Sequence, residues 1–352
     1  MKRVDADHKN LVYSGRVDFR HPKEPVFVFP CTSVRIRFRG KKIRILVGNR
    51  HEYWKNYAGI LSDGEQYAFA LNPEGETELE IPLKPEWEEH EVMLFKRQDG
   101  CHYMTFQGLM LEEDALLLQA TPPPARRIEV FGDSVSAGEV SEAIEFTGKE
   151  DPSHEGEFSN SWYSYAWIAA RMLRAELHDI AQGGIALLDQ TGWYHEPNAV
   201  GMTSIYDKIE YSPMLGEMVP WDFRLWTPDV VVVALGQNDS HPKDYMAEDP
   251  MGEQAKKWVK GYVKFLEKIR KVYPEAQIVC ITTLLIHDPA WDHAIAEAIH
   301  RFRMTHQDPK VSHLLFSRNG SATPGHPRIS EAREMAEELV GYINRLPIPA
   351  WK

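Results

Sequence analysis

The first third of the chain alternates apolar and polar residues. Val34, Ile36 and Phe38, for example, are separated by arginines. A period of two is typical of strands with one buried and one solvated face, and Gly, Asn and Asp turn signals separate these runs. The pattern predicts short strands at residues 12–19, 34–38, 43–47, 67–71, 77–83, 90–97 and 103–110. Many short strands at this spacing favour an all-β sandwich of the jelly-roll type.

The remainder of the chain alternates between strand and helix patterns. We expect strands at residues 127–131, 177–181, 229–235, 277–285 and 312–316, and helices at 161–177, 252–273, 289–304 and 328–343. The run 229–235 is continuously apolar after its first residue, as expected for a strand buried on both faces of a parallel sheet. Repeated strand-then-helix units predict an open parallel sheet covered by helices, which is a three-layer α/β/α domain.

Three consecutive prolines, Pro122 to Pro124, mark the change between the two patterns. Prolines cannot donate backbone hydrogen bonds and favour a stiff, extended linker. We therefore predict a β-sandwich domain at residues 1–120, a linker at 121–126 and an α/β domain at 127–352.

Charge and composition narrow the possible partners. The 352-residue chain has a formal net charge of −12, which argues against nucleic acid and against an anionic membrane surface. The N-terminus leads into no apolar signal-like segment, and the longest apolar run, residues 230–235, is too short to span a bilayer. The three cysteines lie far apart, without metal-ligand spacing or a disulfide framework. These features favour a cytoplasmic protein without a bound metal that acts on a neutral substrate, and they carry no signal for an oligomeric state.

Polar residues directly after the predicted strands are the candidates for chemistry, because ligands bind beyond the carboxyl ends of strands in open parallel sheets. Ser134 follows the first strand in Gly-Asp-Ser, Gly184 follows the second in Gly-Gly, and Asn238 follows the third in Gly-Gln-Asn-Asp. His326 lies between two prolines just before the last predicted helix. Each residue also has an ordinary structural interpretation. Ser134 could cap a helix, Gly184 could form a turn, Asn238 could cap a loop, and His326 could be a surface histidine.

The order Ser, Gly, Asn, His at these places resembles the SGNH or GDSL-type hydrolases over residues 127–352. The resemblance implies that Ser134 is the nucleophile and His326 its base. It also implies an oxyanion hole made by the backbone N–H groups of Ser134 and Gly184 and the side-chain amide of Asn238. No cofactor or metal is needed for such a mechanism.

One position departs from the superfamily pattern. Most members carry an aspartate three residues before the histidine, where this chain has Thr323. Losing a carboxylate that orients the imidazole can cost about four decades in rate. We expect a backbone carbonyl to hold His326 instead, or the enzyme to work as a Ser–His dyad, and we interpret the acidic stretch at residues 139–157 as a solvated loop. Because His326 must begin neutral, activity is expected to fall below about pH 6.5.

The chain resembles carbohydrate esterase family two in its two-domain layout and in lacking the aspartate before the histidine. The family combines an N-terminal jelly roll with an SGNH domain and removes acetyl groups from xylan- and mannan-type oligosaccharides. The resemblance implies a carboxylic ester hydrolase of the acetylesterase or acetylxylan esterase type, with an acetylated oligosaccharide as its partner. A short-chain acyl or lipid esterase on the same frame, and a non-catalytic glycan-binding protein, are the alternatives.

Aromatic residues in the insertion at 190–226 are candidates for stacking on sugar rings. The insertion carries Trp193, Tyr194, Tyr206, Tyr211, Trp221 and Trp226, of which we expect about two to contact ligand. Trp193, Trp221 and Trp226 are our substrate-binding candidates. His287, after the fourth strand of the α/β domain, is a further one.

Overall fold

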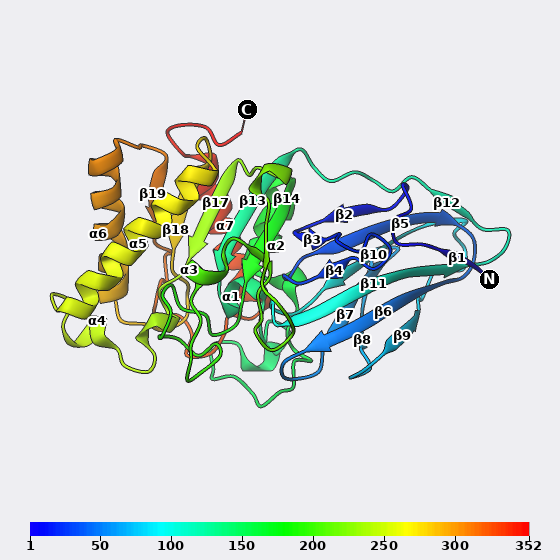
Figure 1. Cartoon of the computed structure of the whole chain (residues 1–352), viewed down its shortest axis with the longest axis horizontal. Coiled ribbons are helices and arrows are strands. Elements are labelled where there is room, and N and C mark those ends of the chain that lie inside the picture. The colour runs from blue at the N-terminus through cyan, green and yellow to red at the C-terminus, as the bar shows by residue number, and fades with distance from the viewer. Residues whose placement is uncertain (352) are drawn as a thin grey trace.

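The N-terminal part of the protein is a sandwich of two antiparallel sheets. We describe residues 1–351 of a computed structural model, in which this sandwich lies beside an α/β part (Figure 1). One six-stranded sheet contains β1 (Lys2–Val4), β3 (Val17–Asp18), β4 (Val26–Phe27), β6 (Ile43–His51), β9 (Glu76–Glu80) and β11 (His102–Leu111). The other contains β2 (Val12–Ser14), β5 (Ser33–Arg39), β7 (Tyr57–Ser62), β8 (Glu65–Ala70), β10 (Glu89–Lys96) and β12 (Leu116–Leu118). The predicted all-β jelly-roll sandwich is confirmed.

The alternating pattern of β5 explains how the sandwich forms its core. Val34, Ile36 and Phe38 are fully buried, whereas Arg37 and Arg39 are exposed. The sequence pattern did not predict β7, which lies between β10 and β8 in its sheet and contains Gly59. A Cβ at this position would lie 2.2–2.5 Å from ring atoms of Phe95, so the strand needs glycine there although glycine weakens the strand pattern.

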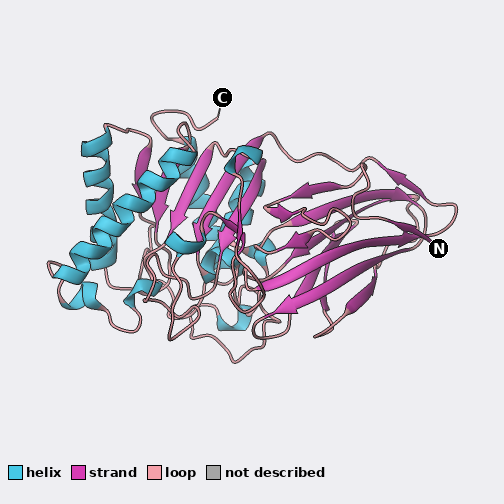
Figure 2. Ribbon diagram, viewed as in Figure 1, coloured by secondary structure: helices cyan, strands magenta, loops and turns pink. Residues whose placement is uncertain are grey.

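The C-terminal part is built on a five-stranded parallel sheet in the order β14-β13-β17-β18-β19. Its strands are β13 (Arg126–Gly132), β14 (Ala175–Ala181), β17 (Val230–Ala234), β18 (Gln277–Ile281) and β19 (Val311–Leu314). The main helices are α2 (Tyr165–Leu173), α5 (Glu253–Val272), α6 (Ala290–His306) and α7 (Ile329–Asn344). Helices cover both faces of this sheet, whose strands end along one edge among long loops (Figure 2). The predicted three-layer α/β/α architecture is confirmed.

Short elements fill the loops around the sheet. They are α1 (Ser134–Ala137), α3 (Met202–Ile205), α4 (Tyr245–Glu248), the strand pair β15 (Lys208–Glu210) and β16 (Val219–Pro220), and the 3₁₀ turns η1 (Ile144–Phe146), η2 (Ser161–Tyr163), η3 (Phe223–Leu225) and η4 (Asn238–Ser240).

Alternate residues of the apolar strand β17 pack on opposite layers. Val231 and Val233 belong to a core cluster with residues of α5 and α6. Val230 and Val232 belong to a cluster with residues of α2 and α7. A strand covered on both faces has no solvated side, which is why the run 229–235 is not amphipathic.

The boundary between α2 and β14 differs from the prediction. A helix was expected over residues 161–177, but α2 begins after Ser164, whose hydroxyl accepts a hydrogen bond from the Trp167 N–H at 3.2 Å. It ends at Arg174, which adopts a left-handed conformation with φ of 52°. The strand then begins at Ala175, because a left-handed residue terminates the helical hydrogen-bond pattern.

The sandwich and the α/β part are joined by buried contacts. Phe29 and Tyr103 of the sandwich belong to the same core cluster as Phe131 of β13. The fully buried Arg16, between β2 and β3, forms an ion pair of 3.0 Å with the fully buried Glu129 of β13. The proline-rich stretch lies between β12 and β13, so a boundary at 121–126 remains our proposal.

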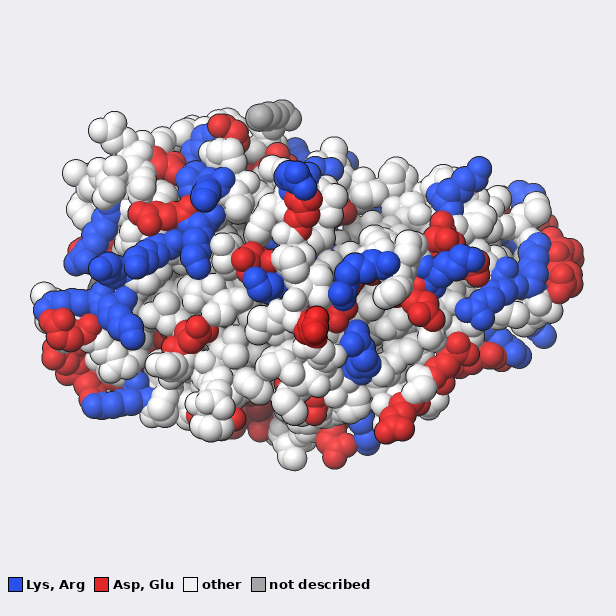
Figure 3. Space-filling view, viewed as in Figure 1, with Lys and Arg blue, Asp and Glu red and all other residues white. Residues whose placement is uncertain are grey.

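The surface carries both signs of charge. Over residues 1–351, no helix is both long and apolar enough to cross a membrane. On the face shown in Figure 3, acidic and basic side chains are mixed, and lysines and arginines gather over α5. These basic residues belong to a helix that does not line the cleft described below.

Candidate active site

Ser134 and His326 lie in hydrogen-bond contact at the carboxyl edge of the parallel sheet. Ser134 is the first residue of α1, directly after β13 and the N-cap residue Asp133. His326 precedes α7, 192 positions further along the chain. The distance from His326 Nε2 to Ser134 Oγ is 2.8 Å. This geometry allows the imidazole to take the hydroxyl proton.

Asp151 holds the other side of the imidazole. Its Oδ2 atom lies 2.5 Å from His326 Nδ1, and its Oδ1 atom accepts a hydrogen bond from the His326 backbone N–H at 2.9 Å. Our expectation that a backbone carbonyl orients this ring is therefore wrong, as is the interpretation of the whole acidic stretch as solvated. Thr323 donates its hydroxyl to the carbonyl of Gly325 at 3.0 Å and takes no part in this contact.

Two residues of the loop that carries His326, Gly325 and Arg328, hold the segment that contains Asp151 in place. Arg328, fully buried, lies 2.9 Å from Asp151 Oδ1 and also donates to the Ala143 carbonyl at 3.1 Å. A Cβ at Gly325 would lie 2.6 Å from both Asp151 Oδ1 and the carbonyl oxygen of Lys149. Only glycine leaves room for this close approach. The contact of Asp151 with His326 therefore depends on Gly325 and Arg328, which lie on either side of the histidine in the chain.

Charge in the site favours the cationic form of His326. Burial lowers the pKa of His326, but the carboxylates of Glu139 and Asp151 more than offset this and raise the pKa to about 9. Burial opposes ionisation of Asp151, yet hydrogen bonding and charge from His326 hold the pKa of Asp151 well below its ordinary value. Burial raises the pKa of Glu139 to about 7. A base that gains a proton during the reaction is stabilised by these two neighbours.

The predicted oxyanion-hole residues, Gly184 and Asn238, line the same cleft as Ser134. Gly184 has φ of +70°, a conformation that favours glycine, and its carbonyl accepts hydrogen bonds from the N–H groups of Trp193 and Tyr194 at 2.8 and 3.1 Å. The Asn238 amide donates to Asp133 Oδ2 at 3.3 Å, which uses one of its two N–H groups.

Asp239 holds the loop that carries Asn238. The fully buried Asp239 accepts hydrogen bonds from the Leu187 N–H at 2.9 Å and from the Trp258 indole at 2.8 Å. It therefore connects the loops that follow β14 and β17 to helix α5.

A cleft of about 630 Å³ contains all four residues, Ser134, Gly184, Asn238 and His326. Its further lining includes an aromatic and acidic set from both parts of the protein: Glu52, Tyr53, Trp54, Glu139, Trp193, Tyr194 and Glu196. Tyr53 and Trp54 lie in the loop after β6 and were missed by sequence reasoning, since no local pattern links a sandwich loop to the α/β part. Trp193 is 58% exposed and stacks on His241 with ring centroids 3.3 Å apart.

The other three substrate-binding candidates do not line this cleft. Trp226 is buried, donates to Glu176 at 2.8 Å and stacks on His178. Trp221 lies 5.3 Å from the Arg16 guanidinium. His287 contacts the Leu285 carbonyl and Asp292 at 2.8 and 3.2 Å. Packing and local hydrogen bonds account for all three, so we do not retain them as substrate contacts.

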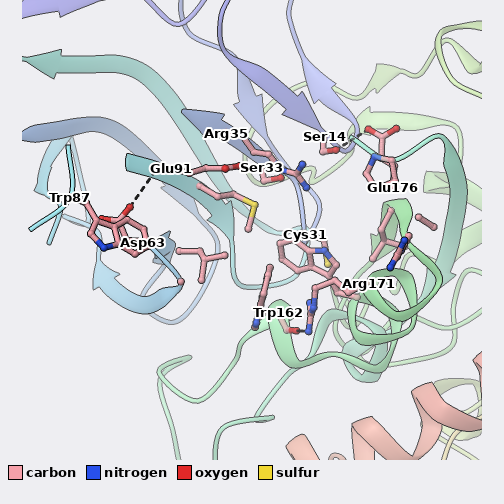
Figure 4. Close-up of a pocket in the computed structure, with 18 residues that line it drawn as sticks. Ser14, Cys31, Ser33, Arg35, Asp63, Trp87, Glu91, Trp162, Arg171 and Glu176 are labelled. Atoms are coloured by element: carbon pink, nitrogen blue, oxygen red, sulfur yellow. Dashed lines mark hydrogen bonds between the residues drawn. The ribbon is translucent and has the colours of Figure 1, made fainter. Parts of the chain in front are cut away.

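A second cavity, of about 780 Å³, lies between the sandwich and α2. Figure 4 shows Cys31, Trp162 and Arg171 grouped on one side of this cavity. It also shows Ser14, whose hydroxyl donates a hydrogen bond to Glu176 at 2.8 Å. Neither Ser134 nor His326 lines it. It has no part in the geometry described above.

The chain resembles known carbohydrate esterases in both sequence and fold. A family model described as carbohydrate esterase 2 N-terminal matches residues 13–123. The chain is 28% identical over 347 residues to cellulase/esterase CelE of Acetivibrio thermocellus, covering 96% of this chain but only 40% of that protein. It is 25% identical to the acetylxylan esterase / glucomannan deacetylase of Cellvibrio japonicus, covering 97% of this chain and 90% of that protein.

Solved structures agree over nearly the whole length. A family two carbohydrate esterase from Clostridium thermocellum in complex with cellohexaose superposes with a TM-score of 0.80 at 26% identity, covering 95% of this chain and 98% of that one. An acetyl xylan esterase from Butyrivibrio proteoclasticus has the same fold, with a TM-score of 0.79 at 22% identity, covering 97% of this chain and 98% of that one. In sequence and in fold, the chain is therefore similar to carbohydrate esterases of family two.

Proposed function

We propose that this protein is a carbohydrate O-acetyl esterase that works through Ser134, His326 and Asp151. The observation that carries the proposal is the continuous contact from Ser134 Oγ through both ring nitrogens of His326 to Asp151, inside a cleft. Ser134 is neutral and weakly nucleophilic by itself, so a base within 2.8 Å is what makes it reactive. The similarity to carbohydrate esterases supports the same reaction class.

The reaction follows from this arrangement in two halves. Ser134 Oγ attacks the acetyl carbonyl carbon while His326 Nε2 takes the hydroxyl proton, and the oxyanion receives hydrogen bonds from Ser134, Gly184 and Asn238. His326 then gives its proton to the leaving sugar oxygen, which leaves an acetyl-serine. Water attacks this ester with His326 again as the base, and acetate and free Ser134 result. Each oxyanion donor contributes about 3–4 kcal/mol when measured by its removal.

The side chains of the cleft favour a neutral sugar substrate. Trp193 presents an exposed indole face, and Trp54 lines the same cleft from the sandwich. Aromatic faces stack on the apolar faces of sugar rings. Glu139 and Glu196 in the lining would repel carboxylated sugars. We therefore propose acetylated oligosaccharides of the xylan or mannan type as substrates.

Release of acetate from acetylated xylo- and gluco-manno-oligosaccharides tests the proposal. Ser134→Ala is expected to abolish release, with Ser136→Ala as the matched control. Ser136 lies two residues away on the same short helix, bonds to the Tyr165 hydroxyl at 2.8 Å and does not line the cleft. Equal turnover by Ser134→Ala and the wild type would overturn the assignment of the nucleophile.

A lipid or longer-chain acyl esterase on the same frame is distinguished by chain length. An acyl chain of eight carbons needs a long apolar groove, whereas this cleft is lined by aromatic and acidic side chains. We expect acetyl esters to be hydrolysed faster than octanoyl esters of the same alcohol. A preference for octanoyl esters would contradict the carbohydrate proposal and leave the serine mechanism intact.

A further inference from the structure

Asp99, from the turn between β10 and β11 of the sandwich, reaches the loop that carries Gly184. The side chain is buried, and Gly100 in the same turn donates its N–H to the carbonyl of Ala181, the last residue of β14. The turn therefore docks directly where the second strand of the parallel sheet ends and the glycine loop begins.

The Asp99 carboxylate holds the residue before Gly184. Its Oδ2 atom accepts a hydrogen bond from the Gly183 N–H at 2.7 Å and another from Gln182 Nε2 at 2.7 Å. Gln182 Nε2 also donates to the carbonyl of Gly183 at 3.0 Å. A Cβ at Gly183 would lie 2.7 Å from Asp99 Oδ2, so glycine is needed for this approach.

These contacts determine how the peptide between Gly183 and Gly184 is turned. A trans peptide is planar, and its C=O and N–H point in opposite directions. Because Gln182 holds the carbonyl of Gly183 on one side, the N–H of Gly184 is aimed away from that side. The two hydrogen bonds from Trp193 and Tyr194 to the Gly184 carbonyl restrain the next peptide as well.

His102 completes the environment of Asp99. Its Nδ1 atom lies 2.9 Å from Asp99 Oδ1, and its Nε2 atom lies 2.7 Å from the carbonyl oxygen of Tyr53. Asp99, Cys101 and His102 are close enough together to suggest a metal-binding trio. Each ring nitrogen of His102, however, already lies within hydrogen-bond distance of a protein oxygen, which accounts for this cluster without a metal ion.

We propose that Asp99 is a positioning residue of the esterase, supplied by the sandwich, which aims the Gly184 N–H at the oxyanion formed on the substrate. This inference rests on the proposed function. It gives the sandwich an indirect part in transition-state stabilisation, in addition to forming one wall of the cleft. Asp99 does not touch the reacting atoms and acts only through the Gly183–Gly184 peptide.

Asp99→Asn is the sharpest test, because it keeps the shape and removes one of the two acceptor oxygens. Five groups lie within hydrogen-bond distance of this carboxylate, namely the Gly183 N–H, Gln182, the Tyr53 hydroxyl, the Cys101 thiol and His102. An amide satisfies fewer of them, so the loop shifts. A displacement of about 1 Å costs on the order of 10²-fold in rate. We expect kcat to fall by about 10²-fold with KM within about threefold of the wild type.

Asp63→Asn is the matched control. Asp63 is also a buried carboxylate of the sandwich paired with a histidine, with Oδ2 2.6 Å from His90 Nδ1, but it lies outside the cleft. Both variants are expected to lower Tm, whereas only Asp99→Asn lowers kcat. Methylboronic acid, which forms a tetrahedral adduct on serine, separates the two roles further. Its Ki is expected to rise by about the same factor as kcat falls in Asp99→Asn alone.

Several outcomes overturn the proposal. The proposal fails if folded Asp99→Asn keeps the kcat and the boronate affinity of the wild type. It also fails if Asp63→Asn loses as much kcat and boronate affinity as Asp99→Asn. A stoichiometric metal ion that is present in the wild type and absent from Asp99→Asn would overturn it as well. If Asp99→Asn does not fold, Gly183→Ala disturbs the same contact from the other side and must show the same rise in boronate Ki. An inactive wild type, by contrast, would refute the proposed function itself.

Discussion

At the residue scale, this site is distinguished by the position in the sequence of the carboxylate that contacts His326. The carboxylate that holds His326 comes from Asp151, in the segment between α1 and α2, and the usual position before the histidine is occupied by Thr323. Against the effect of burial, hydrogen bonding and charge from His326 hold the pKa of the Asp151 carboxyl well below its ordinary value, which favours the ionised form. In the proposed mechanism, Asp151 orients the ring and stabilises the imidazolium that forms when Ser134 attacks.

Replacing Asp151 by Asn is expected to lower kcat by about 10³–10⁴-fold with little change in KM, because the amide favours the wrong tautomer of His326. Steady-state acetate release measures this. Glu150→Gln is the control, since Glu150 is the exposed neighbour of Asp151 and makes no contact with the imidazole. A change of less than about tenfold in Asp151→Asn would mean that the site works as a dyad.

The pH dependence follows from the two acidic neighbours of His326. In the proposed mechanism the neutral imidazole is the active form, so activity is expected to fall as pH drops through the pKa of His326. Because that pKa is raised to about 9, the acidic limb of kcat/KM is expected well above the value of 6.5 that an ordinary histidine implies. Glu139→Gln removes the largest raising charge and is expected to move the limb to lower pH.

A pH profile of kcat/KM for the wild type, Glu139→Gln and Glu145→Gln checks this prediction. Glu145 belongs to the same acidic segment but is exposed, so its removal is expected to leave the limb in place. One pH unit of displacement corresponds to about a tenfold gain in active enzyme below the limb. Coincident profiles for the wild type and Glu139→Gln would show that Glu139 does not act on His326.

At the scale of elements, loops of the sandwich and of the α/β part form the two sides of the cleft. The insertion between β14 and β17 was expected to supply aromatic contacts, and two of the six tryptophans and tyrosines named in it, Trp193 and Tyr194, line the cleft. The others are used in packing. The sequence does not distinguish the aromatic residues that line the cleft from those that pack in the interior, because the difference lies only in their tertiary surroundings.

Trp193→Ala and Trp221→Ala are expected to separate binding from packing. Loss of the exposed Trp193 face is expected to raise KM for acetylated oligosaccharides about 5–30-fold, equivalent to roughly 1–2 kcal/mol, while hydrolysis of a small aryl acetate stays unchanged. Trp221→Ala is expected to leave KM unchanged and to lower the free energy of unfolding, since Trp221 packs beside Arg16. Kinetics and urea denaturation of both variants provide the measurement, and a raised KM in Trp221→Ala alone would reverse the assignment.

At the scale of the whole molecule, the sandwich and the α/β part form one structural unit. Arg16 pairs with Glu129 at 3.0 Å and also donates to the carbonyls of Tyr206 and Lys208 at 2.7 and 3.2 Å. Core residues of both parts belong to the same clusters. We therefore expect a single cooperative unfolding transition for the whole chain.

Arg16→Met is expected to lower the free energy of unfolding by about 3–5 kcal/mol, because it leaves Glu129 buried and unpaired. Adding Glu129→Gln to this variant is expected to recover part of the loss. Arg37→Met is the control, since its pair with Glu89 is exposed and contributes less than about 1 kcal/mol. Urea denaturation followed by tryptophan fluorescence and circular dichroism measures all three, and two separate transitions in the wild type would contradict the coupling.

The sequence by itself determined the two patterns of secondary structure, the parallel sheet and the four residues at its edge. These features are local: a period of two or a buried apolar run is read within one segment, and Ser134, Gly184 and Asn238 each follow directly after a strand. The order of the strands then brings them to one edge. Element ends were less predictable, as at Arg174, where backbone conformation and not polarity ends the helix.

Only the tertiary structure decided which carboxylate serves His326 and which residues complete the cleft. Asp151 is 175 positions from His326, and Asp99 is 84 positions from Gly183. Nothing in the local sequence separates Asp151 from its acidic neighbours, because its role depends on the room left at Gly325 and the charge of Arg328 in a distant loop. Such contacts between remote segments exist only once the sandwich and the sheet have packed against each other.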